Sequence, residues 1–225
     1  MRVAVISDVH SNLHALNEVR RAIELEEVDS VVCAGDLVGY GALPNECCRV
    51  VEELAGEIVL GNHDLSALSR DTTMMNAYAA EAALWTSEEM DERTRRFLSS
   101  MGTERRFMCD DKSVAMFHGS PRDVSEYVYE EEVTEKLLDL AMADIVILGH
   151  THIPYIKSFG DRFVLNPGAV GQPRDGDRRA SFAVMDSQTG EGIIRRVEYD
   201  IESAAAAIES AGLPSMLAER LFSGL

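Results

Sequence analysis

Several features are scarce or absent in this sequence of 225 residues. No apolar run approaches the roughly 18 residues that a membrane-spanning helix needs, so we expect no membrane segment. Positive charge is also scarce, since 21 lysines and arginines stand against 39 aspartates and glutamates and the formal net charge is −18. Tight binding to a nucleic-acid backbone needs clustered Lys and Arg. No basic cluster here exceeds a pair, so we expect no general nucleic-acid binding.

Targeting and disulfide signals are lacking as well. The first apolar stretch is interrupted by Ser7 and Asp8, too early for a signal peptide. We therefore expect a cytoplasmic protein. The four cysteines form no Cys-x-x-Cys pair, which argues against a zinc knuckle or a thioredoxin-like site. Buried, reduced thiols are the simpler interpretation.

The arrangement of apolar residues indicates an α/β protein, because short apolar runs alternate with helical patterns. A single layered domain over residues 1–225 fits this length, with tail helices at about residues 200–225. The expected strands are 3–6, 31–34, 57–60, 106–109, 113–117, 145–148, 155–159, 162–165, 181–185 and 192–199. The expected helices follow Asn12, begin at Pro44, and cover residues 65–100, 131–140 and 201–223.

The helical stretch 65–100 directly follows His63, which is one of the candidate site residues described below. It carries a helix-start signal at residues 86–89, Thr-Ser-Glu-Glu. Packing against the core is one interpretation of its methionines and aromatic residues. The other is a wall or lid that selects the leaving group of a substrate.

Histidines and acidic residues recur where apolar strands end. Five of the six histidines follow such runs, and Gly35-Asp36 follows another in the same way. In open α/β sheets, ligands bind at the carboxyl ends of the strands. The loops that would converge there offer Asp8, His10, Asp36, Asn62, His63, His118, His150 and His152.

This donor set points to metal ions. Imidazole, carboxylate and amide oxygen together suit Mn, Fe, Ni, Co or Zn better than Mg or Ca. The donors are too many for one tetrahedral ion, whereas two ions that share a carboxylate would use them well. A lone Asp-x-His or Gly-Asn-His-Asp is weak and is usually structural. Five such sites at strand ends are hard to assign to chance.

These motifs resemble the calcineurin-like metallophosphoesterase superfamily, and in particular its small prokaryotic phosphodiesterase branch. The matching pieces are Asp8-Val-His10, Gly35-Asp36, Gly61-Asn-His-Asp64, His118 and Gly149-His-Thr-His152. Their order and spacing agree from residue 1 to about residue 185. The resemblance implies a four-layer α-β-β-α sandwich, with two packed β-sheets flanked by helices.

The resemblance also implies roles for individual residues. Asp8, His10 and His152 would hold a first metal ion, and Asn62, His118 and His150 a second. Asp36 would bridge the two ions, with manganese as the first candidate metal and Fe, Ni, Co or Zn as alternatives. A metal-bridging hydroxide would attack phosphorus. His63 would protonate the leaving group or hold a phosphate oxygen, and Asp64 would orient it.

Four further residues have weaker claims to substrate binding. Asn12 is a candidate for phosphate contact but also a good helix N-cap. Arg122 and Arg174 offer a bidentate fork to a phosphate, and surface ion pairs are the alternative. Tyr40 is either a substrate contact or a packing residue.

The expected function is therefore a metal-dependent phosphodiesterase acting on a small phosphoester or nucleotide. A phosphomonoesterase, a dinucleoside-polyphosphate hydrolase and a protein phosphatase remain open alternatives with the same chemistry. A non-catalytic interaction scaffold and a metal-sensing regulator are the alternatives of other classes. The sequence leaves the oligomeric state undecided.

Overall fold

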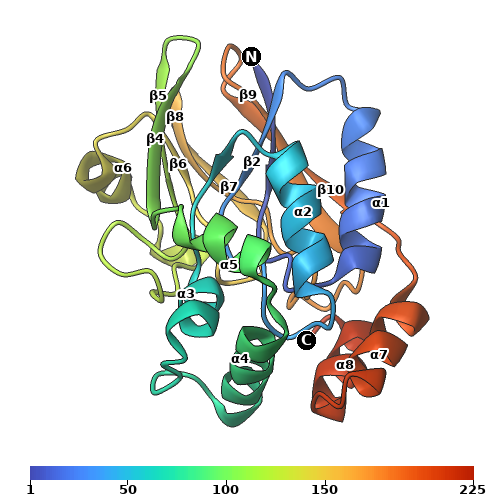
Figure 1. Ribbon diagram of the computed structural model, residues 1–225. Coiled ribbons are helices and arrows are strands. Elements are labelled where there is room, and N and C mark those ends of the chain that lie inside the picture. Colours follow the sequence, from blue (N-terminus) through green and yellow to red (C-terminus); the bar gives the residue numbers. More distant parts are fainter.

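Two five-stranded β-sheets pack face to face in the computed structural model, which describes residues 1–225 (Figure 1). Helices cover the outer face of each sheet. The predicted fold class, an α/β sandwich of two sheets flanked by helices, is confirmed.

The first sheet has the strand order β10-β9-β1-β2-β3. The strands β1, β2 and β3 run parallel, and β9 pairs antiparallel with both β1 and β10. Their bounds are Arg2–Ile6 (β1), Ser30–Cys33 (β2), Glu57–Ile58 (β3), Ala180–Asp186 (β9) and Glu191–Val197 (β10).

The second sheet has the order β4-β5-β6-β8-β7. Its three central strands β5, β6 and β8 are parallel, and β4 and β7 close its edges as antiparallel hairpin partners. The two hairpins expected from the sequence are therefore present. The bounds are Glu104–Cys109 (β4), Lys112–Phe117 (β5), Ile145–Ile147 (β6), Tyr155–Phe159 (β7) and Arg162–Asn166 (β8).

Three apolar clusters separate the layers. Alternate residues of β1 point to opposite sides of the sheet: Val3 and Val5 join the cluster between the sheets, while Ala4 and Ile6 join the cluster under the outer helices. A third cluster lies between the second sheet and helix α6, Glu135–Ala141. Because alternate residues point to opposite faces, one face of each sheet packs against the other sheet and the opposite face packs against helices. The four layers follow from this alternation.

The remaining helices pack mostly against the first sheet or at its end. Their bounds are Leu13–Glu24 (α1), Pro44–Leu54 (α2), Asn62–Ser69 (α3), Ala77–Glu89 (α4), Glu92–Ser99 (α5), Ile201–Ser210 (α7) and Ser215–Ser223 (α8). Figure 1 places α3, α4, α7 and α8 at the lower end of the view, opposite the N-terminus. The chain runs down β1 to that end, so the loops that follow the parallel strands of the first sheet open there.

Two predicted helix boundaries are wrong. Residues 86–89 end α4 instead of starting a helix, because the capping side chains lie elsewhere. Asn76 accepts a hydrogen bond from the amide of Ala79 and starts α4, and Asp91 accepts one from Thr94 and starts α5. The helix expected over 131–140 is a short 3₁₀ turn η1 (Glu130–Glu132) followed by α6.

The helices are too short or too polar to cross a lipid bilayer.

Candidate metal centre

The loops after five strands meet at one point and bring the predicted donors together. Asp8 and His10 follow β1, and Asp36 follows β2. Asn62 and His63 open α3 directly after the segment of β3, His118 follows β5, and His150 and His152 follow β6. Both sheets thus contribute, and every donor is buried or nearly so.

The backbone around the donors is strained. Seven non-glycine residues near the donors have positive φ angles between 48° and 66°. This left-handed conformation costs roughly 1–2 kcal/mol per residue for an L-amino acid, and such strain concentrates at functional sites. The residues are Asp8, His10, Ser11, Asp36, Tyr40, His150 and His152.

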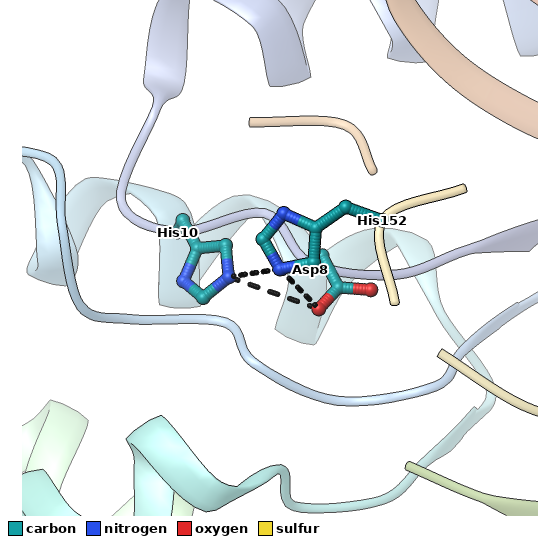
Figure 2. Close-up of side chains that lie close together, drawn as sticks. All are labelled: Asp8, His10 and His152. Carbon is teal, nitrogen blue, oxygen red and sulfur yellow. Dashed lines mark hydrogen bonds and ion pairs between the residues drawn. The ribbon is translucent and has the colours of Figure 1, made fainter. Parts of the chain in front are cut away.

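One group of donors consists of Asp8, His10 and His152 (Figure 2). The Nε2 atoms of the two histidines lie 3.1 Å apart. Asp8 Oδ1 lies 3.2 Å from Nε2 of His152 and 3.7 Å from Nε2 of His10. In Figure 2 the three side chains point toward one another, as ligands of a single ion would.

A second group consists of Asp36, His118 and His150. Asp36 Oδ2 lies 3.2 Å from Nε2 of His118 and 3.6 Å from Nε2 of His10. Asp36 therefore reaches both groups, the position expected of a shared carboxylate. His63 joins His10 and Asp36 in a third, overlapping group.

Backbone carbonyls fix the orientation of three imidazole rings. Nδ1 of His10 lies 3.1 Å from the carbonyl oxygen of Val38. The corresponding contacts are 2.8 Å from His118 to Ala34 and 2.5 Å from His152 to Gln172. A carbonyl only accepts, so Nδ1 carries the hydrogen and Nε2 keeps a free lone pair. This is the usual outer support of a metal-binding histidine.

The donor atoms themselves lack well-aligned hydrogen-bond partners. A buried polar atom without a partner is costly, and a cation at the centre of these atoms would remove that cost. The donor chemistry therefore fits divalent metal ions. The buried, unpartnered atoms are Asp8 Oδ1, Asp36 Oδ2, Asn62 Oδ1, His118 Nε2 and His150 Nε2.

The pKa values of the donors follow from burial and from their mutual charges. Burial lowers the pKa of both His63 and His150 to about 4, so these rings are neutral at pH 7. Burial alone would raise the pKa of Asp36, but the neighbouring His118 and His63 outweigh it and hold that pKa well below its usual range. In return, Asp36 and Asp8 overcome burial and raise the pKa of His118 to about 10, so a metal ion bound there would displace a proton from this ring.

His63 lies beside the two groups of donors. Its Nδ1 is buried without a partner, and its backbone amide donates to Asp36 Oδ1 at 2.9 Å. The ring packs against Tyr40, with centroids 4.3 Å apart, and edge-on against His10 at 4.8 Å. A Cβ on Gly39, whose φ is +91°, would lie 2.5 Å from His63 Nδ1, so this close approach requires glycine.

The expected side-chain contact between Asp64 and His63 is absent. Asp64 Oδ1 accepts from the amide of Val38 at 3.0 Å, and Oδ2 accepts from the amide of Gly61 at 2.9 Å. Asp64 therefore holds two site loops together and does not orient the imidazole. Both of its oxygens are already occupied by backbone donors.

A cavity of about 410 Å³ opens beside the donors. Its floor includes Asp36, Asn62, His63, His150 and His152. One wall comes from α3, the α3–α4 loop and the start of α4, so part of the stretch 65–100 forms a wall as the functional interpretation proposed. The wall residues are Leu65, Ser66, Ser69, Asp71, Thr73, Met74, Met75, Asn76 and Ala79.

The weaker substrate candidates separate in space. Tyr40 and Arg174 line the cavity, and Arg174 Nη2 donates to Tyr40 Oη at 3.2 Å. Asn12 does not line the cavity: its Oδ1 accepts from the amide of Ala15, and its Nδ2 donates to Gly171. Its N-cap role is confirmed. Arg122 lines a different pocket and pairs with Glu126 at 2.7 Å, the ion pair given as its alternative.

Sequence reasoning missed the part of the cavity that the loop after β5 forms, which includes Val124, Ser125 and Tyr127. Tyr127 lies on the loop after β5, and its ring centroid is 4.1 Å from that of His150. Tyr129 stacks against it, with ring planes 12° apart. The only local signal was the repeat Tyr127-Val-Tyr129 downstream of His118.

Comparisons with known proteins show which family the chain resembles. A sequence model described as the calcineurin-like phosphoesterase superfamily domain matches residues 1–190. An uncharacterized protein of Methanocaldococcus jannaschii is 36% identical over 99% of this chain and 98% of its own length. Phosphodiesterase YfcE of Escherichia coli K12 is 24% identical over 83% of this chain and 88% of its own length.

Solved structures share the whole fold. The crystal structure of a metallophosphoesterase from Sphaerobacter thermophilus has a TM-score of 0.84 and 35% identity, covering 100% of this chain and 99% of that one. A hypothetical protein from Pyrococcus horikoshii OT3 has a TM-score of 0.90, with 18% identity over 100% of this chain and 98% of that one. At 18% identity, the similarity to the Pyrococcus horikoshii protein shows only that the two folds are alike.

Proposed function

The chain belongs to the calcineurin-like phosphoesterase superfamily, and we propose that it is a hydrolase that cleaves phosphodiesters with the help of two divalent metal ions. The observation that carries the proposal is the convergence of buried donor atoms without partners at the floor of one cavity. A protein that needed these residues only for its fold would have paired them with one another or with the backbone.

The donor geometry supports a division of the ligands into two sets. Asp8, His10 and His152 would hold one ion, and Asn62, His118 and His150 the other, with Asp36 in contact with both. When bound, such an ion pair activates water and neutralises charge on the phosphoryl oxygens. Manganese is the first metal to test, and Fe, Ni, Co and Zn are the alternatives.

His63 would protonate the leaving group or hold a phosphate oxygen; because its ring is neutral at pH 7 in the free protein, it would first take up a proton when the negatively charged substrate enters the cavity. Its ring borders the cavity, and Tyr40 and His10 pack against the ring and fix its plane. An alkoxide leaves far more easily once it is protonated, and a positioned general acid contributes a large part of such a rate.

Diesters are the substrates that the cavity favours. A diester carries a second esterified group, and the cavity offers that group apolar surface from Leu65, Met75, Val124 and Tyr127. The similar protein YfcE is named a phosphodiesterase. Both observations support a diester above a monoester.

The test compares two esters with the same leaving group. Protein stripped of metal is supplied with Mn²⁺, and hydrolysis of bis-p-nitrophenyl phosphate is measured beside that of p-nitrophenyl phosphate. We expect metal-dependent cleavage with the diester preferred. A preference for the monoester would make the protein a phosphatase. A protein that holds two metals but cleaves neither ester would contradict the proposal and favour a scaffold role.

A further inference from the structure

One arginine of the cavity has no part in the proposed hydrolysis. Arg174 is the only lysine or arginine that lines the cavity. Its Nη2 donates to Tyr40 Oη at 3.2 Å and to Gln172 Oε1 at 3.0 Å, its Nε is buried without a partner, and it forms no ion pair with a carboxylate. In a chain with a net charge of −18, an unpaired cation in the substrate cavity is an attractive site for an anion.

The guanidinium lies to one side of the donor atoms. Its Cζ is 5.6 Å from the centroid of the Tyr40 ring, and the other contacts of that ring are His63, at 4.3 Å, and His10, at 4.6 Å. Tyr40 therefore bridges Arg174 and the imidazoles. An anion on Arg174 would sit beside the scissile phosphate and would be a separate group of the substrate.

The loop that carries Arg174 is held rigidly. Asp175 pairs with Arg196 on β10, and the amide of Gly176 donates to the carbonyl of Gly224 at 2.9 Å. On the other side, Gln172 accepts from Nδ1 of His152. The position of the guanidinium is thus fixed relative to a metal-binding residue, which lowers the entropic cost of binding a ligand there.

We propose that Arg174 is a subsite for a second phosphate group of the substrate. The preferred substrates are then phosphodiesters that carry another phosphate outside the scissile linkage. This inference rests on the proposed function and adds the substrate class. Arginine suits the role because its planar fork matches a phosphate with two parallel hydrogen bonds.

A matched pair of substrates tests the subsite. Thymidine 5′-(p-nitrophenyl phosphate) and its 3′-phosphorylated form share the scissile diester and the leaving group, and they differ by one phosphate. We expect the protein to prefer the 3′-phosphorylated ester by about 10- to 100-fold in kcat/KM, mainly through KM, since a charge-assisted hydrogen bond contributes on that scale. Arg174→Met should remove most of this preference, and Arg174→Lys should keep part of it.

Arg122→Met is the control, because Arg122 is paired with Glu126 in a different pocket. It should keep the preference of the unmodified protein. If the unmodified protein shows no preference, or if Arg174→Met lowers kcat equally on both esters, the subsite is refuted; the second result would place Arg174 at the scissile phosphate.

A binding measurement keeps this test separate from the proposed activity. Isothermal titration compares thymidine 3′,5′-diphosphate with thymidine 5′-monophosphate on the manganese-loaded protein. Tighter binding of the diphosphate that disappears in Arg174→Met supports the subsite even if no ester is cleaved. Equal binding of both nucleotides overturns it, whereas loss of all ester cleavage alone would overturn only the hydrolase.

Discussion

At the scale of single residues, the proposed chemistry depends most on His63. Replacing it in His63→Gln removes the proton donor but leaves Asp8, Asp36 and the other donors in place. We expect kcat to fall by about 100- to 10,000-fold on a diester with a nucleoside leaving group. The fall should be smaller on a p-nitrophenyl ester, because p-nitrophenolate leaves without being protonated. Steady-state kinetics on both esters would show the difference.

Metal analysis of the same variant separates proton transfer from ligation. His63 shares a group with His10 and Asp36, so a direct role in metal binding is the competing explanation. We expect His63→Gln to keep the metal content of the unmodified protein, measured by plasma mass spectrometry. Loss of one equivalent together with activity would make His63 a ligand.

A substitution at Gly39 tests whether the position of the His63 side chain matters for activity. In Gly39→Ala, the new methyl group would lie 2.5 Å from His63 Nδ1 and force the ring to move. Both Gly39 and Gly160 have positive φ, but a Cβ on Gly160 meets no atom within 4 Å. Each alanine variant should lose about 1–2 kcal/mol of stability from backbone strain. Only Gly39→Ala should also lose most of its turnover, so equal activities in the two variants would contradict the close contact.

The residues show where sequence reasoning was sufficient and where it was not. Donors that directly follow apolar strands were predictable, because strand direction alone brings them to one edge. Asn12 and Arg122 were not separable from Arg174 by sequence, since their partners Gly171, Glu126 and Tyr40 are set by tertiary packing. Tyr127 was missed because a tyrosine in an irregular loop has no periodic pattern.

At the scale of elements, the loop after β5 contributes the aromatic ring of Tyr127 to the cavity. Replacing this residue tests the proposed preference of the cavity for an apolar ester group. Tyr127→Ala removes a ring that contacts His150, and aromatic contacts of this kind contribute about 0.5–1.5 kcal/mol beyond their burial. We expect KM for bis-p-nitrophenyl phosphate to rise by roughly 2- to 10-fold. KM for methyl p-nitrophenyl phosphate should change less.

Tyr78 on α4 is the matched control for Tyr127. Both side chains are 47% exposed, but Tyr78 does not line the cavity. Tyr78→Ala should leave both KM values as they are in the unmodified protein. A similar rise in the two variants would show that the effect of Tyr127→Ala is nonspecific.

The ends of the helices are set by capping residues more than by the hydrophobic pattern. The strands and their order of appearance followed from apolar runs, and the tail consists of two helices, α7 and α8, which are separated at residues 212–214, Gly-Leu-Pro. The start signal at residues 86–89 failed because Asn76 and Asp91 already cap the two helices. The pairing of β9 with β1 joins residues far apart in the sequence, which no local pattern reports.

At the scale of the whole molecule, the site lies where the loops of the two sheets meet. His118, His150 and His152 come from loops of the second sheet, while Asp8, His10 and Asp36 come from loops of the first. Metal bound between them would therefore tie the two halves together. Without it, buried unpartnered atoms and strained backbone face one another across the junction.

Metal binding should consequently stabilise the entire fold. At a free Mn²⁺ concentration about 100 times the dissociation constant, the gain is about 2.7 kcal/mol per site, or roughly 5–10 °C in Tm for a chain of this size. Differential scanning calorimetry of EDTA-treated protein with and without Mn²⁺ measures it. The gain should shrink as pH falls toward 5, because protons compete with the metal for the imidazoles. It should also shrink in Asp36→Asn, which loses the carboxylate that reaches both donor groups. An equal gain in that variant would show that Mn²⁺ binds elsewhere on this acidic protein.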